Sequence, residues 1–184
     1  MTLRTALLLM LGGLPLLASG HNFVVGQRVA PVGIADRGEL LLQQGEPAWQ
    51  SWNSARLSGT PGVVLHMAGR LSAKSLNAPL IDAIHQAAFP TDKLHLITIV
   101  NTDDAIPGSA LFVRRSLQES KRQSPAARFV IDERGAARNA WQLSAGGSAV
   151  VVLDPTGRVR FAKDGALTPA EVQQVMLLLH QLVQ

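Results

Sequence analysis

VVLHMAGRLSAKSLNAPLI, residues 63–81, is the stretch that decides the fold. Its first residues are apolar and β-branched, which predicts a buried strand that ends at Gly69. Ser72 is then expected to accept free amide hydrogens at the start of a helix. Pro79 removes one backbone hydrogen bond from that helix, so a kink is expected there. The stretch therefore predicts a strand that runs into a kinked helix.

Four more strands are expected after this stretch, because apolar and β-branched residues cluster in short runs. The last two are separated by a turn and predict a hairpin. The four runs are 95–100, 128–132, 149–153 and 158–162.

Three helices are expected between and after these strands. The first, 109–123, is expected to turn its apolar residues inward and its basic residues outward, and the second, 137–143, to bury Trp141. The last is the best defined, because Thr168, Pro169 and Glu171 have the pattern of a capping box.

The segment before residue 63 predicts a hairpin extension. Its two arms are 32–34 and 40–42, with the turn at 36–39. Trp49 and Trp52 are three residues apart, which predicts that both rings cover the sheet edge from one side of a helical turn.

The order of these elements predicts an α/β domain. The strands at 63 and 95 need a right-handed crossover to pair in parallel, whereas the last two strands pair antiparallel, so the sheet is expected to be mixed. With hydrophobic residues at 47% and no internal repeat, residues 21–184 are expected to form a single domain.

Residues 1–20 have the pattern of a secretory signal peptide. Arg4 precedes an apolar run over 6–17, and small residues follow at 18–20. The run is shorter than the roughly 20 residues that a membrane-spanning helix needs. We expect cleavage after Gly20 and no stable membrane association of the mature chain.

Charge and cysteine content exclude several classes of function. The net charge of +4 falls to about +3 when Arg4 is removed, and acidic residues interrupt the basic ones over 114–128, so no nucleic-acid partner is expected. The chain has no cysteine, which excludes disulfides and thiol chemistry.

The order of elements resembles the thioredoxin fold, and a set of strings in the same order resembles the YtfJ family of bacterial periplasmic proteins. This resemblance covers almost the whole chain. It implies a thioredoxin-like three-layer α/β/α fold with a mixed central sheet and an N-terminal hairpin extension, in the periplasm, but it brings no established substrate. The strings are WNSARLSG, AGRLSAKS, IVNTDDAIPGS, WQLS, VVLDPTGRVRFAKDGALT and EVQQVM.

Comparison with redox-active thioredoxins implies that this chain is redox-inactive. Their Cys-x-x-Cys motif is followed by a helix-kinking proline five residues after the second cysteine. Here Pro79 lies five residues after Lys74, which places Leu71 and Lys74 on the cysteine positions. The thioredoxin cis-proline would fall near Ser148, where a trans bond is expected because a cis bond at a non-proline residue costs about 3 to 4 kcal/mol. Without a thiol, dithiol exchange is excluded.

A candidate ligand or partner cleft is expected where the parallel strands end, since open α/β sheets bind ligands there. Arg70 and Lys74 could hold a phosphate or carboxylate with the amides of a helix start. The preferred interpretation is that one of them pairs with Asp103 or Asp104 in a solvated loop, worth about 0 to 1 kcal/mol. The candidate residues are Arg70, Ser72, Lys74, Asp103, Asp104, His66 and Ser148.

No metal site and no cofactor are predicted. The five histidines lack the short spacings of zinc ligands. His66 is expected to lie under the cleft as a hydrogen-bonded structural residue. His21 could chelate copper as the mature N-terminus, but an exposed terminus that binds no metal is preferred. Asp103 and Asp104 are neighbours in a loop and are not expected to converge as paired catalytic acids.

Two classes of function follow. The preferred one is a non-catalytic periplasmic binding or interaction module, whose partner is an unknown periplasmic protein or a small anionic ligand. The alternative is a thiol-independent enzyme, or a metal- or anion-binding protein, that uses Arg70 and Lys74 together with Asp103 and Asp104.

Overall fold

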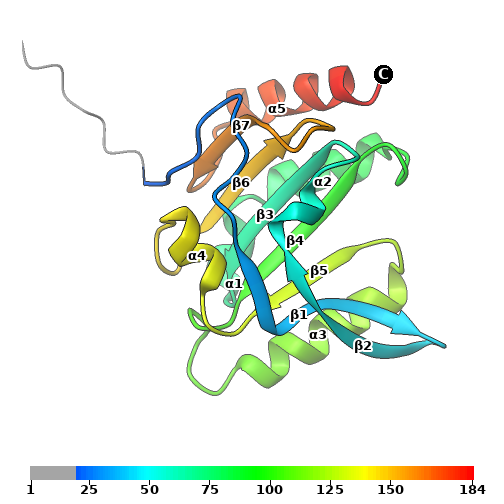
Figure 1. Cartoon of the computed structure of the whole chain (residues 1–184), viewed down its shortest axis with the longest axis vertical. Coiled ribbons are helices and arrows are strands. Elements are labelled where there is room, and N and C mark those ends of the chain that lie inside the picture. Colours follow the sequence, from blue (N-terminus) through cyan, green and yellow to red (C-terminus); the bar gives the residue numbers. More distant parts are fainter. Residues whose placement is uncertain (1–19) are drawn as a thin grey trace, which may run out of the picture.

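The structure is a computed structural model that describes residues 20–184. One mixed sheet has the strand order β2-β1-β5-β4-β3-β6-β7 (Figure 1). The strands are β1 (Gly33–Gln43), β2 (Glu46–Asn53), β3 (Gly62–Ala68), β4 (His95–Asn101), β5 (Arg128–Asp132), β6 (Ser148–Leu153) and β7 (Val159–Asp164). The helices are α1 (Leu71–Leu76), α2 (Ala78–Ala87), α3 (Ala110–Gln123), α4 (Ala136–Trp141) and α5 (Pro169–Leu182), with a 3-10 turn η1 (Ser54–Leu57).

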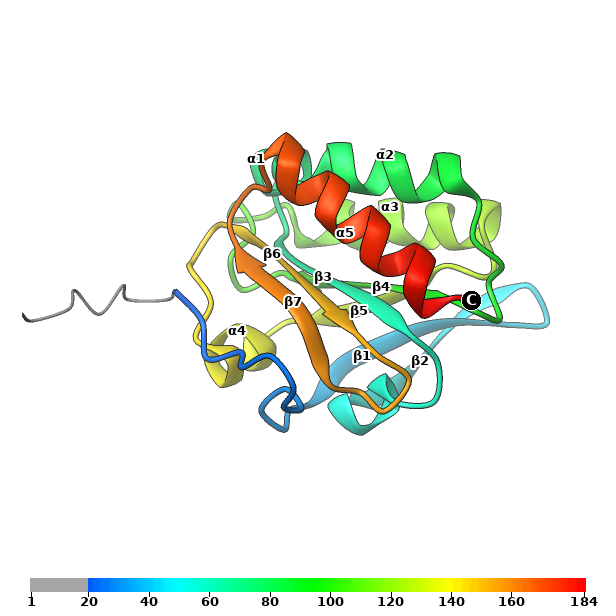
Figure 2. The ribbon, with the colours of Figure 1, turned by 90° about the horizontal axis from the view of Figure 1, so that it is seen from above.

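Helices cover both faces of the sheet, as Figure 2 shows. On one face, where α1, α2, α3 and α5 lie, Leu65 of β3 packs in a core with Leu80 and Leu179. On the other face, Val64 packs in a core with Trp141 of α4. The expected three-layer α/β/α arrangement with a mixed sheet is therefore confirmed.

The stretch over 63–81 lies at the centre of the fold. β3 pairs in parallel with β4 and antiparallel with β6. The expected kink divides the helix into α1 and α2 at Asn77, with Pro79 in the first turn of α2. The predicted cap is wrong, because Arg70 is the N-cap residue and makes no side-chain cap hydrogen bond. Ser72 lies inside α1 and is exposed.

The N-terminal hairpin exists, but its turn lies elsewhere. β1 runs through 36–39, and the chain reverses at Gln44 and Gly45, which have φ of 54° and 86°. A two-residue turn with both φ angles positive matches the twist of the flanking strands. Gly38 is instead part of a bulge, since the register of β1 on β2 shifts between Ile34 and Glu39.

The two tryptophans near residue 50 lie on β2 and not on a helical turn. Residues three apart on a strand point to opposite faces. Trp52 is buried in the core with Ile34, whereas Trp49 is half-buried under the guanidinium of Arg37, 5.6 Å from the ring centroid. Because side chains alternate between the two faces of a strand, Trp49 and Trp52 lie on opposite faces of β2, and not on one side as a helical turn would place them.

The orientation predicted for α3 is wrong in its first turn and at Lys121, although Val113 and Leu117 are half-buried as expected. Phe112 and Leu111 are exposed, and Lys121 is buried. The ammonium of Lys121 donates hydrogen bonds to the carbonyls of Pro125 (2.7 Å) and Ala127 (2.6 Å), which compensate for its burial.

The last helix, α5, has the predicted start. The Thr168 hydroxyl accepts from the Glu171 amide (3.3 Å), and the Glu171 carboxylate accepts from the Thr168 amide (2.7 Å). Val175 and Leu179 are buried, whereas Leu177 is exposed.

An N-terminal segment, residues 21–32, leads into β1 and crosses the face that carries α4. Asn22 donates through its backbone amide to the Trp141 carbonyl (3.1 Å) and through its side chain to the Ala140 carbonyl (2.8 Å). The ring of Phe23 lies 5.6 Å from that of Trp141. His21 is half-buried and stacks on Phe23, so it is not the exposed terminus that was predicted. The predicted leader, apart from Gly20, lies outside the described residues.

Candidate functional site

Three loops meet where β3, β4 and β5 end. The parallel registers place Ala68 beside Asn101, and Asn101 beside Asp132. The Gly69 amide donates to the Asn101 carbonyl (2.8 Å), and the Thr102 amide donates to the Asp132 carbonyl (2.9 Å). The loops before α1, α3 and α4 are therefore joined by backbone hydrogen bonds, and we call this region the corner.

The guanidinium of Arg70 is held at the corner by hydrogen bonds within the protein. Its Nε donates to the backbone carbonyl of Asp104 (2.8 Å), and its Nη2 donates to the same oxygen. Its Nη1 lies so close to Gly146 that a Cβ there would be 3.4 Å away. Arg70 thus binds the acidic loop through a neutral carbonyl, and not through a carboxylate as predicted.

Asp103 and Asp104 do converge, on a basic residue that the sequence analysis missed. Arg138 of α4 donates from Nη2 to Asp103 Oδ2 (3.2 Å) and from Nη1 to Asp104 Oδ1. Asp104 Oδ2 also accepts from the side chain of Asn101 (3.1 Å) and from the Gly146 amide (3.2 Å). With three donors from the protein on its two oxygens, the Asp104 carboxylate is fixed in place as a structural part of the corner.

His66 lies buried on the α4 face of β3. Burial is the main cause that lowers its pKa from 6.5 to about 4; Asp104 and Asp164 oppose the shift and Arg138 adds to it. Its Nε2 has no hydrogen-bond partner among residues 20–184. His66 is therefore a neutral imidazole under the corner near pH 7, and this nitrogen lacks the hydrogen bond that was expected.

Ser148 is buried beside the junction of α1 and α2. Its hydroxyl accepts from the side-chain amide of Asn77 (3.0 Å). Asn77 also donates to the Gly165 carbonyl (3.2 Å) and accepts from the Leu167 amide (3.0 Å). The peptide bonds of residues 20–184 contain no cis bond, in agreement with the trans bond predicted at Ser148. Asn77 was missed, although a polar residue two positions before a kinking proline is a usable signal.

Asp132 was also missed, and it positions Arg138. Its two carboxylate oxygens accept from the Ala136 amide (2.9 Å) and the Ala137 amide (2.8 Å), at the start of α4. Burial raises its pKa, while these backbone hydrogen bonds act in the opposite direction.

An apolar rim, defined here as Leu71, Ile106, Leu111 and Phe112, lies on the loop and helix starts that follow β3 and β4. Their exposed fractions are 83%, 60%, 48% and 72%. They are four of the eight large hydrophobic residues that are exposed in the described part of the chain. Ser72 and Lys74 are exposed on α1 beside Leu71, and among residues 20–184 the ammonium of Lys74 has no hydrogen-bonding or ionic partner.

Hydrogen bonds connect the loops that carry the rim. Leu71 follows Arg70, which is bonded to Asp104, two residues before Ile106. The Ile106 carbonyl accepts from the Ser109 hydroxyl (2.6 Å) and amide (2.9 Å), immediately before α3 begins. Leu111 and Phe112 are in the first turn of α3. Clustered exposure of this kind marks interaction surfaces more often than single exposed residues do.

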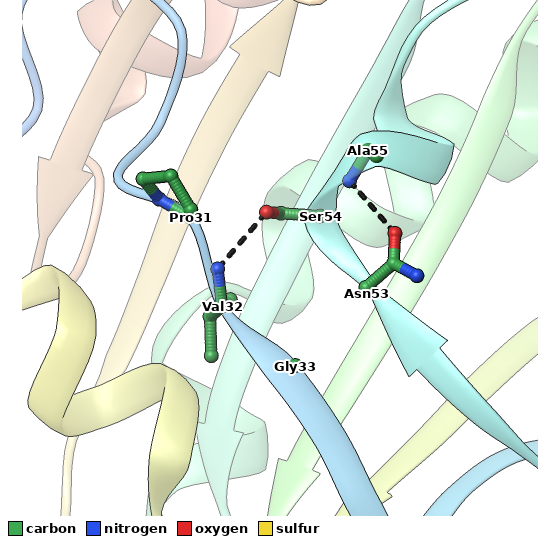
Figure 3. Close-up of a pocket in the computed structure, with 6 residues that line it drawn as sticks. All are labelled: Pro31, Val32, Gly33, Asn53, Ser54 and Ala55. Atoms are coloured by element: carbon green, nitrogen blue, oxygen red, sulfur yellow. Dashed lines mark hydrogen bonds between the residues drawn. The ribbon is translucent and has the colours of Figure 1, made fainter.

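The two best-formed cavities lie away from these residues. The larger, about 460 Å³, is a shallow hollow between residues 31–33 and 53–55 (Figure 3). Its polar groups bond to each other: the Val32 amide donates to the Ser54 hydroxyl (3.0 Å), and the Ala55 amide donates to the Asn53 side chain (3.1 Å). No charged side chain lines it, so it offers little for recognition of a polar ligand.

Residues 20–184 contain no group of three or more His, Cys, Asp or Glu side chains arranged to hold a metal ion. None of their helices is long and apolar enough to cross a membrane.

Comparison with solved structures shows the fold. A putative protein disulfide isomerase from Bacteroides thetaiotaomicron is similar with a TM-score of 0.58 and 15% identity, over 90% of this chain and 93% of that one. A thiol-disulfide isomerase from Corynebacterium glutamicum is similar with a TM-score of 0.57 and 16% identity, over 84% and 97%. The fold is thus thioredoxin-like, and this chain carries it without cysteine.

Comparison with sequences shows the family. Residues 23–182 match the family described as "Bacterial protein of unknown function (YtfJ_HI0045)". The chain is 55% identical to "Uncharacterized protein YtfJ" of Escherichia coli (strain K12) over the full length of both. It is 38% identical to a protein of Haemophilus influenzae over 89% of each chain. The chain therefore belongs to the YtfJ family.

Proposed function

We propose that this chain is a non-catalytic binding module and that its partner surface is the apolar rim. The observation that carries the proposal is Leu71, which is 83% exposed as the first residue of α1, directly before Ser72 and three residues before Lys74. Exposing a leucine side chain forgoes roughly 1.5 to 3 kcal/mol of burial free energy, which a partner would recover.

The internal contacts of the corner support binding over catalysis. Arg70 and Arg138 are both held by the β4–α3 loop, and the Asp104 carboxylate accepts hydrogen bonds from three donors of the protein. A general acid or base needs a group that can exchange a proton with a substrate in reach. His66 has the right chemistry but is buried under the corner.

The anion-binding alternative has weaker support, since among residues 20–184 only Lys74 of the predicted pair has a charged group without a hydrogen-bonding or ionic partner. A chemical-shift titration with inorganic phosphate tests it directly. Shifts at residues 70–75 below millimolar phosphate would favour an anion site over the rim.

The same proposal includes a periplasmic location after removal of residues 1–20. It is supported by the leader pattern, with its charged residue, apolar run and small residues. Edman sequencing of the protein from a periplasmic fraction is expected to begin at His21, and an N-terminus at Met1 would contradict this.

Photo-crosslinking in living cells tests the partner surface. A benzoylphenylalanine at position 71 or 112 is expected to yield a specific adduct with another periplasmic protein. Position 177 on α5 is the matched control, because Leu177 is similarly exposed, at 66%, but lies outside the rim. Equal adducts at positions 71 and 177, or none at positions 71 and 112, would contradict the proposal.

A further inference from the structure

Basic side chains accompany the apolar rim at helical spacing. Lys74 lies three residues after Leu71 on α1. On α3, Arg115 lies three residues after Phe112 and four after Leu111. Side chains three or four apart share one face of a helix. The rim residues on helices therefore each have a cation beside them.

These cations are not neutralised within the described chain. Among residues 20–184, no carboxylate forms an ion pair with Lys74, Arg114 or Arg115. The two acids of the corner, Asp103 and Asp104, are paired with Arg138. Arg70, bound to the backbone carbonyl of Asp104, balances the second of these two carboxylate charges, so the positive surplus comes from Lys74, Arg114 and Arg115. The surface that carries the rim is consequently positive.

The shape of the rim disfavours a small ligand. Neither of the two best-formed cavities includes a residue of the rim or of the corner. Small molecules are bound in concave sites that bury most of their surface. Side chains exposed by 60% to 83% can instead insert between the side chains of an opposing macromolecule.

We propose that the apolar rim docks an acidic, apolar segment of another protein. This inference rests on the proposed function and adds the chemistry of the partner. Apolar side chains of the segment cover Leu71, Ile106 and Phe112, and its Asp or Glu side chains lie opposite the cations on α1 and α3. The charges speed encounter and reject basic segments, while apolar burial supplies most of the affinity.

Two synthetic amphipathic peptides of equal length test the charge preference. One carries leucine and glutamate and the other leucine and lysine, with the same apolar positions. Binding of each peptide to the protein purified from cells in its processed form is measured by fluorescence anisotropy. The acidic peptide is expected to bind at least tenfold more tightly, to weaken with added salt, and to shift amide resonances of residues 71–75 and 106–115.

Charge reversal at the rim has a matched control elsewhere. The double variant Lys74→Glu/Arg115→Glu is expected to lower the affinity for the acidic peptide roughly three- to tenfold, since exposed ion pairs are worth about 0.2 to 1 kcal/mol each. Lys93→Glu/Arg160→Glu changes net charge equally but at the opposite end of the sheet, because residue 93 precedes β4 and residue 160 lies on β7 opposite the end of β6 that pairs with the start of β3. This variant is expected to bind like the parent.

Each other outcome overturns the inference in a different way. Equal binding of both peptides would show an apolar surface without charge selection, and the crosslink at position 71 would still stand. Binding of neither peptide would overturn the acidic-segment partner. Binding to vesicles of phosphatidylglycerol, with no binding to the acidic peptide, would assign the rim to an anionic lipid surface. The absence of crosslinked adducts at positions 71 and 112, by contrast, would contradict the proposed function itself.

Discussion

At the scale of single residues, His66 couples the stability of the fold to pH. Its folded pKa of about 4 lies below its unfolded value of 6.5, so the neutral form is the one that the fold favours. The associated stability is fully present above pH 6.5 and is lost as the pH falls from 6.5 toward 4. At pH 4.5 the loss is expected to be about 2 to 3 kcal/mol, because one pKa unit corresponds to about 1.4 kcal/mol.

Urea unfolding at pH 7 and pH 4.5 measures this loss. His66→Gln is expected to reduce the difference between the two pH values, while His85→Gln, at an exposed position of α2, is expected to leave it unchanged. An unchanged difference in His66→Gln would assign the acid sensitivity to other groups.

Arg138 is the second residue whose removal has a defined cost. Arg138→Met leaves the carboxylate of Asp104, only 11% exposed, without its cation. We expect a loss of about 2 to 4 kcal/mol in the free energy of unfolding, since removing one partner of a largely buried pair strands the other charge.

The matched control is Arg122→Met, because Arg122 pairs with Glu46 and Glu119 at the surface. Its loss is expected to be within about 0.5 kcal/mol. Adding Asp104→Asn to Arg138→Met should restore part of the stability, and strict additivity of the two changes would contradict a coupled pair.

At the scale of elements, the bulge in β1 depends on Gly38. Its φ is 83°, and a Cβ there would lie 2.0 Å from the Gln50 carbonyl oxygen of β2. Gly38→Ala is therefore expected to destabilise the protein by about 2 to 4 kcal/mol, from backbone strain and the clash together.

Gly45→Ala is the control, because Gly45 has a similar φ of 86° but open space around its Cβ position. The strain alone is expected to cost about 1 kcal/mol. Thermal unfolding of both variants compares them, and equal losses would mean that the contact with Gln50 contributes nothing.

Helices and strands with strong local signals could be predicted from the sequence. The β-branched run of β6 and the capping box of α5 depend on neighbouring residues, and both appear as expected. The hairpin turn was predicted in the wrong place because Gly38, which suggested a turn, lies in a bulge. Its positive φ allows the close approach of β1 to β2 there. The burial of Lys121 on α3 was missed because its ammonium is satisfied by two carbonyls of the following loop.

The candidate site could be placed but not assembled from sequence. The end of β3 and the loop after β4 followed from parallel topology, which is why Arg70, Asp103 and Asp104 were found. Arg138 lies 34 residues after Asp104, on a helix whose docking local patterns do not encode. Asp132 and Asn77 act through backbone groups, and such partners become visible only when the chain is folded.

At the scale of the whole molecule, the N-terminal segment fastens distant parts of the chain together. Besides Asn22 and Phe23 on α4, the Gly26 amide donates to the Val159 carbonyl (2.8 Å), and the Val159 amide donates to the Gln27 carbonyl (2.8 Å). The segment thereby joins α4 to the start of β7.

Phe23→Ala is expected to lower the free energy of unfolding by about 1 to 3 kcal/mol, because a partly buried ring loses its packing on Trp141. Val25→Ala, at a position 67% exposed, is the control and should change it by less than about 0.5 kcal/mol. Urea unfolding followed by tryptophan fluorescence measures both, and similar small changes would mean that the segment contributes little.

The pairing of β3 with β6 also sets the order in which the chain can complete its fold. β3 is bonded on one side to a strand that begins at residue 148, so its own hydrogen bonding is finished only when the last quarter of the polypeptide has arrived. Pairings between such distant segments form slowly. A chain exported amino end first would thus remain unfolded, and able to pass through a translocation channel, until nearly all of it had emerged on the far side.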